Sequence, residues 1–280
     1  MAFIAPVRPS PIAGAWYEGN PKALARVVDQ YLDQAKLPDL PGEVIALIAP
    51  HAGHIYSGPV AGYAFATVRG KTPDVVAVLS PMHQPYHESL LTTAHSAYET
   101  PLGQVPVDSD MVAKLDSRLR TSLGYGLTPV AYDHEHSLEI ELPFLQRSLG
   151  PGFKILPVMV RSQSAKVSQQ LGADLADTLN GTNALIVAST DLSHFYTQDE
   201  AVAFDMEMLR RIESFSPEAV FSAEKEGQGF ACGLGALTAV LWAAKALGAN
   251  KVKVLRHATS GDVTGDYSSV VGYGAAVILK

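Results

Sequence analysis

The chain of 280 residues contains a single cysteine, Cys232, so an internal disulfide is impossible. A lone thiol is typical of proteins from reducing compartments, and we therefore expect a cytoplasmic protein. The N-terminal segment MAFIAPVRPSP lacks the basic start of a signal peptide, and Pro6 interrupts its short apolar stretch. We accordingly expect no export.

Positive charge is also scarce in this sequence. Lysine and arginine number 21 against 28 aspartates and glutamates, which gives a net charge of −7, and no basic run is interleaved with aromatic residues. Nucleic acids and anionic membranes attract basic proteins, so neither is expected as a partner.

The uncharged stretch of residues 227–244 approaches the length of a membrane span. Four glycines and Gln228 weaken that interpretation. We expect instead a helix buried within the protein core.

Three short apolar runs each end in a polar turn that carries a histidine. They are IALIAP before His51, VVAVLS before His83, and ALIVAST before Asp191 and His194. Apolar runs without alternation are typical of strands buried on both faces of a parallel sheet. Ligands of such sheets bind beyond the carboxyl ends of the strands, so these side chains are expected to converge on one site.

The remaining pattern alternates strands with helices, which indicates an α/β fold. With 47% hydrophobic residues the chain can bury a large core, and we expect a single domain over residues 1–280, with a central, largely parallel or mixed sheet flanked by helices. Asn20 and Pro21 predict the start of a helix that reaches about residue 36. Residues 89–107 have mixed character, and TPLGQVPVD resembles a hairpin or a β-arm. Further elements are expected as a strand at 153–160, helices near 164–179, 200–215 and 234–247, and two terminal strands.

The histidines suggest a metal or acid/base site, because imidazole is both a common transition-metal ligand and a proton carrier near neutral pH. Taken alone, His51 or His83 more often supports a tight turn. The convergence of three strand ends reverses that balance. Cys232, taken alone, is more often a small buried hydrophobic residue than a ligand.

Two further pairs have the spacing of cooperating residues. Asp191 and His194 lie three residues apart in a turn that enters a helix, and could act as a proton carrier and the group that orients it; the alternative is a turn cap and a surface histidine. His136 and Glu139 would share one face of a helix that begins near His136 and is capped by Asp133. They could orient a ligand or contact substrate, and a solvated polar cluster is equally compatible.

The motifs themselves carry a resemblance. In order, they are AGAWYEG, APHAGHIYSGPVAGYA, LSPMHQ, YETPLGQVPVD, DHEHSLEIELPFLQ, VASTDLSHF, ACGLGAL and SSVVGYGAA. This series resembles the Memo family, also called protein B of the AmmeMemoRadiSam system, over about residues 14–275. That family is similar to the class III extradiol ring-cleavage dioxygenases, which have an α/β fold and use non-haem Fe(II).

The resemblance implies roles for particular residues. His51 of PHAG, His83 of SPMH and Cys232 of ACG match metal-contacting positions, and Asp191 and His194 of STDLSH match positions beside the metal. The cofactor implied is a divalent transition metal, with Fe(II) first and copper or zinc as alternatives. Dioxygenases of this class have a carboxylate where this chain has Cys232, and a thiolate is a softer donor that also favours copper or zinc.

Three functions follow from this interpretation. The first is a redox, dioxygenase-like reaction. Its substrate would be a small molecule, aromatic or not, or a peptide. The second is metal-assisted hydrolysis in which His194 moves the proton. The third is a non-enzymatic protein that binds a metal, a peptide or a partner in a radical-SAM pathway.

Overall fold

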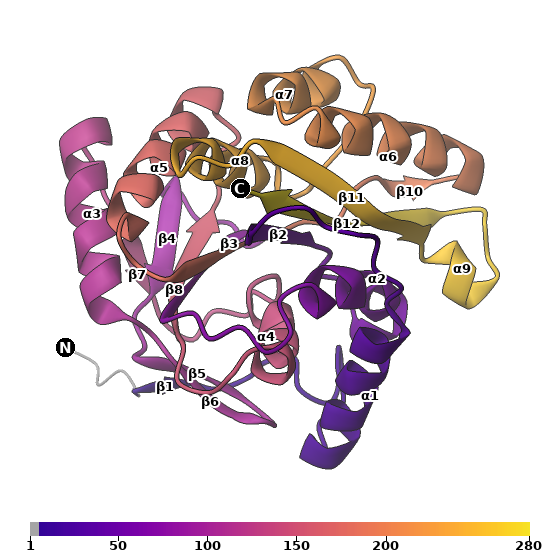
Figure 1. The fold of residues 1–280 in the computed structure, drawn as a ribbon, viewed down its shortest axis with the longest axis horizontal. Helices are drawn as coiled ribbons and strands as arrows, with labels where there is room; N and C mark the ends of the chain where they lie inside the picture. The colour runs from indigo at the N-terminus through magenta and orange to yellow at the C-terminus, as the bar shows by residue number, and fades with distance from the viewer. Residues whose placement is uncertain (1–5) are drawn as a thin grey trace.

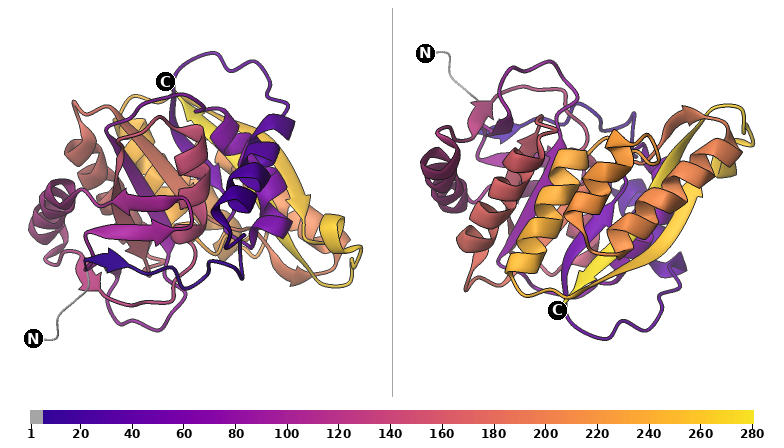
Figure 2. Two further views of the ribbon diagram at one scale, coloured as in Figure 1. Left: turned by 90° about the horizontal axis from the view of Figure 1, so that it is seen from below. Right: turned by 90° about the horizontal axis from the view of Figure 1, so that it is seen from above.

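The computed structural model describes residues 6–280 and shows a central sheet between two layers of helices (Figures 1 and 2). Residues 1–5, on which part of the expectation about export depends, lie outside the described residues. Within residues 6–280 the sheet has nine strands. They are β2 (Val44–Ala49), β3 (Val75–Pro81), β4 (Leu90–Thr93), β7 (Thr128–Val130), β8 (Lys154–Val160), β9 (Ala184–Ser189), β10 (His194–Tyr196), β11 (Lys251–Thr259) and β12 (Val270–Leu279).

The strand order places the three motif strands side by side. The order is β10, β12, β2, β9, β3, β8, β4 and β7. Strand β11 lies outside this order and pairs with β12. Strands β2, β9, β3 and β8 run parallel, whereas β12 pairs antiparallel with β2. The expected mixed sheet is confirmed. Because β2, β9 and β3 are parallel neighbours, their carboxyl ends meet at one edge of the sheet.

Helices cover both faces of the sheet and enclose two apolar cores (Figure 2). One face carries α3 (Ser109–Leu123), α5 (Ala165–Leu179), α6 (Gln198–Glu213), α7 (Pro217–Lys225) and α8 (Leu234–Ala246). The other carries α1 (Pro21–Gln34), α2 (His54–Ala66) and α4 (Leu142–Ser148). Side chains alternate between the cores along each central strand, because successive residues of a strand point to opposite faces.

Smaller elements complete the chain. A three-stranded sheet is formed by β1 (Val7–Arg8), β5 (Ala97–Thr100) and β6 (Gly103–Pro106), with β5 and β6 forming the expected hairpin. Two short helical segments, η1 (Glu139–Glu141) and α9 (Gly261–Thr264), lie in connections.

Several expected elements are confirmed in detail. The Asn20 side chain accepts hydrogen bonds from the backbone N–H groups of Lys22 and Ala23, and Pro21 opens α1. Nearly every residue of α8 is buried, so the part of the uncharged stretch from Leu234 onward is a core helix. In residues 6–280, no helix combines the length and the apolar character needed to cross a lipid bilayer.

Three local predictions were wrong. No helix begins at His136: helical structure starts at Glu139 with η1, and α4 starts at Leu142, where Pro143 suits the first turn because it has no N–H to pair. Asp133 does not cap a helix but pairs with Arg8. His194 does not enter a helix either, since it pairs with Val271 of β12 and begins β10.

Candidate metal centre

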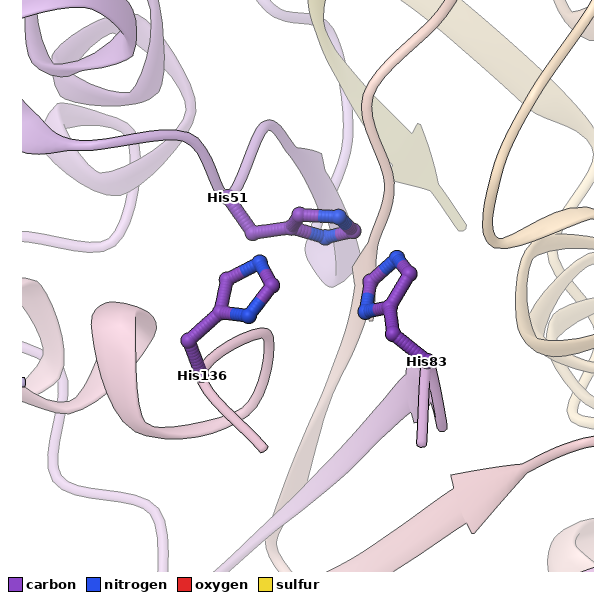
Figure 3. Close-up of side chains that lie close together, drawn as sticks. All are labelled: His51, His83 and His136. Atoms are coloured by element: carbon purple, nitrogen blue, oxygen red, sulfur yellow. The ribbon is translucent and has the colours of Figure 1, made fainter. Parts of the chain in front are cut away.

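Three histidine side chains converge at the carboxyl edge of the sheet (Figure 3). His51 follows the end of β2 by two residues, His83 follows the end of β3 by two residues, and His136 lies in the loop before η1. One ring nitrogen of each histidine lies within 4.8 Å of those of the other two. Sequence analysis anticipated the meeting of His51 and His83, and the structure adds His136 to them.

Hydrogen bonds at Nδ1 orient the rings of His51 and His83. The Nδ1 atom of His51 lies 2.9 Å from the Ser189 hydroxyl, and Nδ1 of His83 lies 2.9 Å from Oε1 of Glu135. Both contacts leave Nε2 as the nitrogen available to a ligand. Such partners commonly fix the orientation of metal-binding histidines.

Glu135 is a buried anion that holds the cluster together. Its carboxylate accepts hydrogen bonds from the backbone N–H groups of His83, His136 and Ser137, in addition to the His83 ring. Burial opposes its ionisation, but these hydrogen bonds hold the pKa of Glu135 well below its usual range. The anion therefore balances positive charge brought to the neighbouring histidines.

The imidazoles of His51 and His136 are neutral at physiological pH. Burial, reinforced by the neighbouring His136 and His83, lowers the pKa of His51 well below its usual value. Burial likewise lowers the pKa of His136 to about 4. Neutral imidazole is the form that binds metals. The side chain of His83 is 39% exposed, so the cluster opens toward solvent.

Cys232 lies at the edge of the histidine cluster. Its sulfur is 3.2 Å from Nε2 of His51 and accepts a hydrogen bond from the backbone N–H of Asp191 at 3.2 Å. Among residues 6–280, the group that shares the 4.8 Å spacing is His51, His83 and His136, without Cys232. Burial, followed by the nearby Asp191 carboxylate, raises the pKa of the thiol. Ligation by Cys232 stays a prediction, and it requires the thiol to lose its proton.

Asp191 and His194 both lie beside the cluster, with separate partners. Asp191 accepts a hydrogen bond of 2.8 Å from the backbone N–H of His51, and burial raises its pKa to about 7. Nδ1 of His194 donates to the carbonyl of Leu192 at 2.8 Å, which leaves Nε2 free to exchange a proton. The spacing of the two residues had suggested Asp191 as the group that orients His194. The structure shows that the carbonyl of Leu192 orients it instead.

Glu139 does not pair with His136. It is fully buried, and it accepts hydrogen bonds from Arg8, Ser10 and Tyr17. Arg8 also binds the carboxylate of Asp133 and the carbonyl of Glu135, at 2.7 and 2.8 Å. Glu139 therefore anchors the loop that carries Glu135 and His136, through Arg8, rather than contacting His136 itself.

A cavity of about 480 Å³ adjoins this edge of the sheet. The ring of Trp16, one of its walls, packs on His136 with 4.1 Å between ring centroids. Phe195, another wall, is exposed and has a φ of 66°, an unusual backbone conformation for a bulky residue. None of the described residues that line the cavity is charged; they are Ala15, Trp16, Ala52, Gly53, Ile55, Tyr56, Phe195, Ser260, Thr264, Ser269, Val271 and Tyr273.

Sequence reasoning missed Glu135, Ser189 and Trp16. A signal existed for Ser189, because a hydroxyl group ends an otherwise apolar strand at the edge where the site forms. Glu135 stands between His134 and His136 without a distinguishing pattern, and Trp16 lies far from the histidines in sequence.

Comparison with known proteins gives one consistent result. The family model described as Memo-like protein matches residues 8–277. A MEMO1 family protein of Nitrosopumilus maritimus is 34% identical, covering 96% of this chain and 98% of that protein. The MEMO1 family protein MTH_45 of Methanothermobacter thermautotrophicus is 35% identical over 95% and 98% of the two chains, and one of Methanococcoides burtonii is 33% identical over 98% and 100%.

Proposed function

This chain belongs to the Memo family, and from that premise we propose that it is a metal-dependent enzyme that carries out a redox, dioxygenase-like reaction on a small substrate. The observation that supports the proposal is the convergence of three imidazoles whose donor atoms lie within 4.8 Å of one another. Fe(II) is the metal proposed first, with copper or zinc as alternatives.

The residues present fit such a metal. Both rings are oriented through Nδ1, so that Nε2 of His83 and Nε2 of His51, the latter 3.2 Å from the Cys232 sulfur, are the nitrogens that would bind the metal. His136 supplies the third nitrogen, and Cys232 is proposed as a further donor once deprotonated. Bound Fe(II) would supply open coordination positions for O₂ and substrate.

The residues around the cluster have complementary tasks in this proposal. His194, held by the Leu192 carbonyl, gives or takes a proton at Nε2. Asp191 fixes the backbone of His51. The uncharged walls of the cavity, including Trp16, favour an uncharged small molecule or an apolar peptide side chain as substrate, because a charged group would lose its hydration there without a partner.

Metal-assisted hydrolysis is the second candidate, and a specific observation favours it. Three histidines, like those that converge here, form the donor set of zinc sites that activate water. In that case His194 would move the proton of the attacking water. A non-enzymatic binding role, a link to a radical-SAM pathway and a cytoplasmic location remain proposals that follow from family membership and composition.

The experiment is metal analysis of untagged protein purified without added metal, followed by an anaerobic Fe(II) titration. His51→Ala, His83→Ala and His136→Ala should each weaken Fe(II) binding by more than roughly 100-fold, beyond the usual effect of losing a supporting residue. His87→Ala, which removes an exposed histidine outside the cluster, should leave it unchanged. Wild-type affinity in all three cluster variants would refute the site.

Reactivity then separates the candidates. Oxygen uptake by the Fe(II)-loaded protein with small aromatic probe substrates such as catechol supports the redox function. Ester hydrolysis by the zinc-loaded protein, without oxygen uptake by the iron form, supports the second candidate. Metal binding with neither activity supports a binding protein.

A further inference from the structure

The hydroxyl of Ser189, at the end of β9, makes three close polar contacts. Its oxygen lies 2.9 Å from Nδ1 of His51, 2.7 Å from the carbonyl oxygen of Ser137 and 2.7 Å from Oε1 of Glu141. All four residues are buried. Water is thus not at hand to replace any of these hydrogen bonds, and each contact requires a proton.

Counting protons leaves one arrangement that satisfies all three contacts. A serine hydroxyl donates one hydrogen bond and accepts two, and the Ser137 carbonyl can only accept. The Ser189 proton therefore goes to Ser137. The two remaining contacts must be donated to Ser189, one by an N–H at Nδ1 of His51 and the other by a protonated carboxyl group of Glu141.

An ionised Glu141 would break this arrangement. The carboxylate would take the only Ser189 proton, and the oxygens of Ser189 and Ser137 would face each other at 2.7 Å with no proton between them. The environment of Glu141 also disfavours a charge. Its side chain is fully buried, its Oε2 has no hydrogen-bond partner among the described residues, and burial raises its pKa well above the usual value, with Asp191 adding to the effect.

We propose that Ser189 and a neutral Glu141 are positioning residues that hold His51 in its Nδ1–H tautomer, so that the lone pair of Nε2 faces the metal centre. This inference rests on the proposed function only where it concerns a metal. The position of Cys232 agrees with this tautomer. Its sulfur lies 3.2 Å from Nε2 of His51, so a protonated thiol can donate a hydrogen bond to the lone pair of that nitrogen. A neutral imidazole without such a partner exchanges between two tautomers, of which only one leaves Nε2 free.

The tautomer and the carboxyl proton are measured on the full chain after treatment with a chelator. Nitrogen-15 NMR of histidine-labelled protein, with the His51 signals identified through His51→Gln, reports which ring nitrogen carries the proton. Infrared difference spectra between wild type and Glu141→Gln report whether Glu141 contributes the C=O band of a protonated carboxylic acid. Co²⁺ titration then measures affinity at the same site.

Three variants separate positioning from simple damage to the fold. Ser189→Ala removes the acceptor, and should shift His51 toward a mixture of tautomers and weaken Co²⁺ binding roughly 10- to 100-fold. Glu141→Gln keeps a donor toward Ser189, and should preserve the tautomer and keep affinity within about threefold while it loses the carboxylic acid band. Ser168→Ala is the matched control, because Ser168 is also a fully buried serine, without a side-chain partner in the described structure; it should change none of these readouts.

The contrary results are equally definite. An unchanged His51 tautomer in Ser189→Ala, or the absence of a Glu141 carboxylic acid band, overturns the inference. So does a Glu141→Gln variant that loses affinity as severely as Ser189→Ala, because an ionised Glu141 would then be required. If wild type binds no Co²⁺, the proposed function fails, and the NMR and infrared measurements still decide the inference.

Discussion

Replacing Arg8 with methionine tests how the loop of the candidate metal centre is held. The Arg8 side chain is 1% exposed and makes ion pairs with Asp133 and Glu139, both buried as well. Its guanidinium also donates to the carbonyl oxygens of Asp133 and Glu135. Methionine keeps the apolar length of the side chain and removes every one of these hydrogen bonds.

The expected cost follows from the charges that are left behind. Breaking a buried ion pair by removing one partner destabilises a protein by about 3–5 kcal/mol, because the remaining charge stays desolvated. That is a large part of the ordinary 5–15 kcal/mol free energy of unfolding. Burial already raises the pKa of Glu139 with Arg8 present, and losing the cation raises it further. Because the pKa of Glu139 is raised in the folded state, the loss of unfolding free energy in Arg8→Met is largest at neutral pH. It shrinks as the pH falls toward the usual pKa of a glutamate.

The assay is urea unfolding of wild type and Arg8→Met at pH 7.5 and pH 5, followed by circular dichroism. The control is Arg120→Met, which breaks an exposed ion pair between Arg120 and Asp116 and should cost less than about 1 kcal/mol. Equal losses in the two variants, or a deficit in Arg8→Met that grows at pH 5, would show that the buried ion pair does not have the assigned role.

Three other outcomes are expected. Burial lowers the pKa of His54 from 6.5 to about 4, so wild type should lose about 2 kcal/mol of unfolding free energy between pH 7.5 and pH 5 that His54→Gln does not lose; parallel curves for the two proteins would contradict this. Glu135→Gln should weaken Co²⁺ binding roughly 10- to 100-fold, whereas Glu99→Gln at an exposed site should not, and equal affinities would remove Glu135 from the site. Alkylation of Cys232, followed by mass spectrometry, should be slower in metal-loaded than in metal-free protein if its sulfur binds the metal; identical rates would leave it outside the coordination sphere.

The sequence predicts the sheet and the edge where the site forms because both depend on local patterns. The apolar runs of β2, β3 and β9 are long enough to be recognised individually, and their parallel arrangement brings His51 and His83 together. Asn20 and Pro21 mark a helix start by their own chemistry.

The loop that carries His136 could not be predicted in this way. Its course depends on Arg8, more than 120 residues away in sequence, whose guanidinium binds Asp133, Glu139 and the Glu135 carbonyl. A helical spacing suggested that His136 and Glu139 share a face, but tertiary ion pairs override that local preference. The short strand β7 and helix α7 were also not anticipated, since neither has a long periodic pattern.

The strand order has a consequence for how this protein folds. His51 and His83 come from neighbouring parts of the chain, but β9, which lies between β2 and β3, is more than 100 residues further along. Closing so long a loop is entropically costly, and folds dominated by such distant pairings form slowly. The histidines can meet in their final geometry only after β9 has inserted. A metal that binds only this geometry would stabilise the completed fold by mass action. It would bind weakly to partly folded chains in which β9 has not yet inserted.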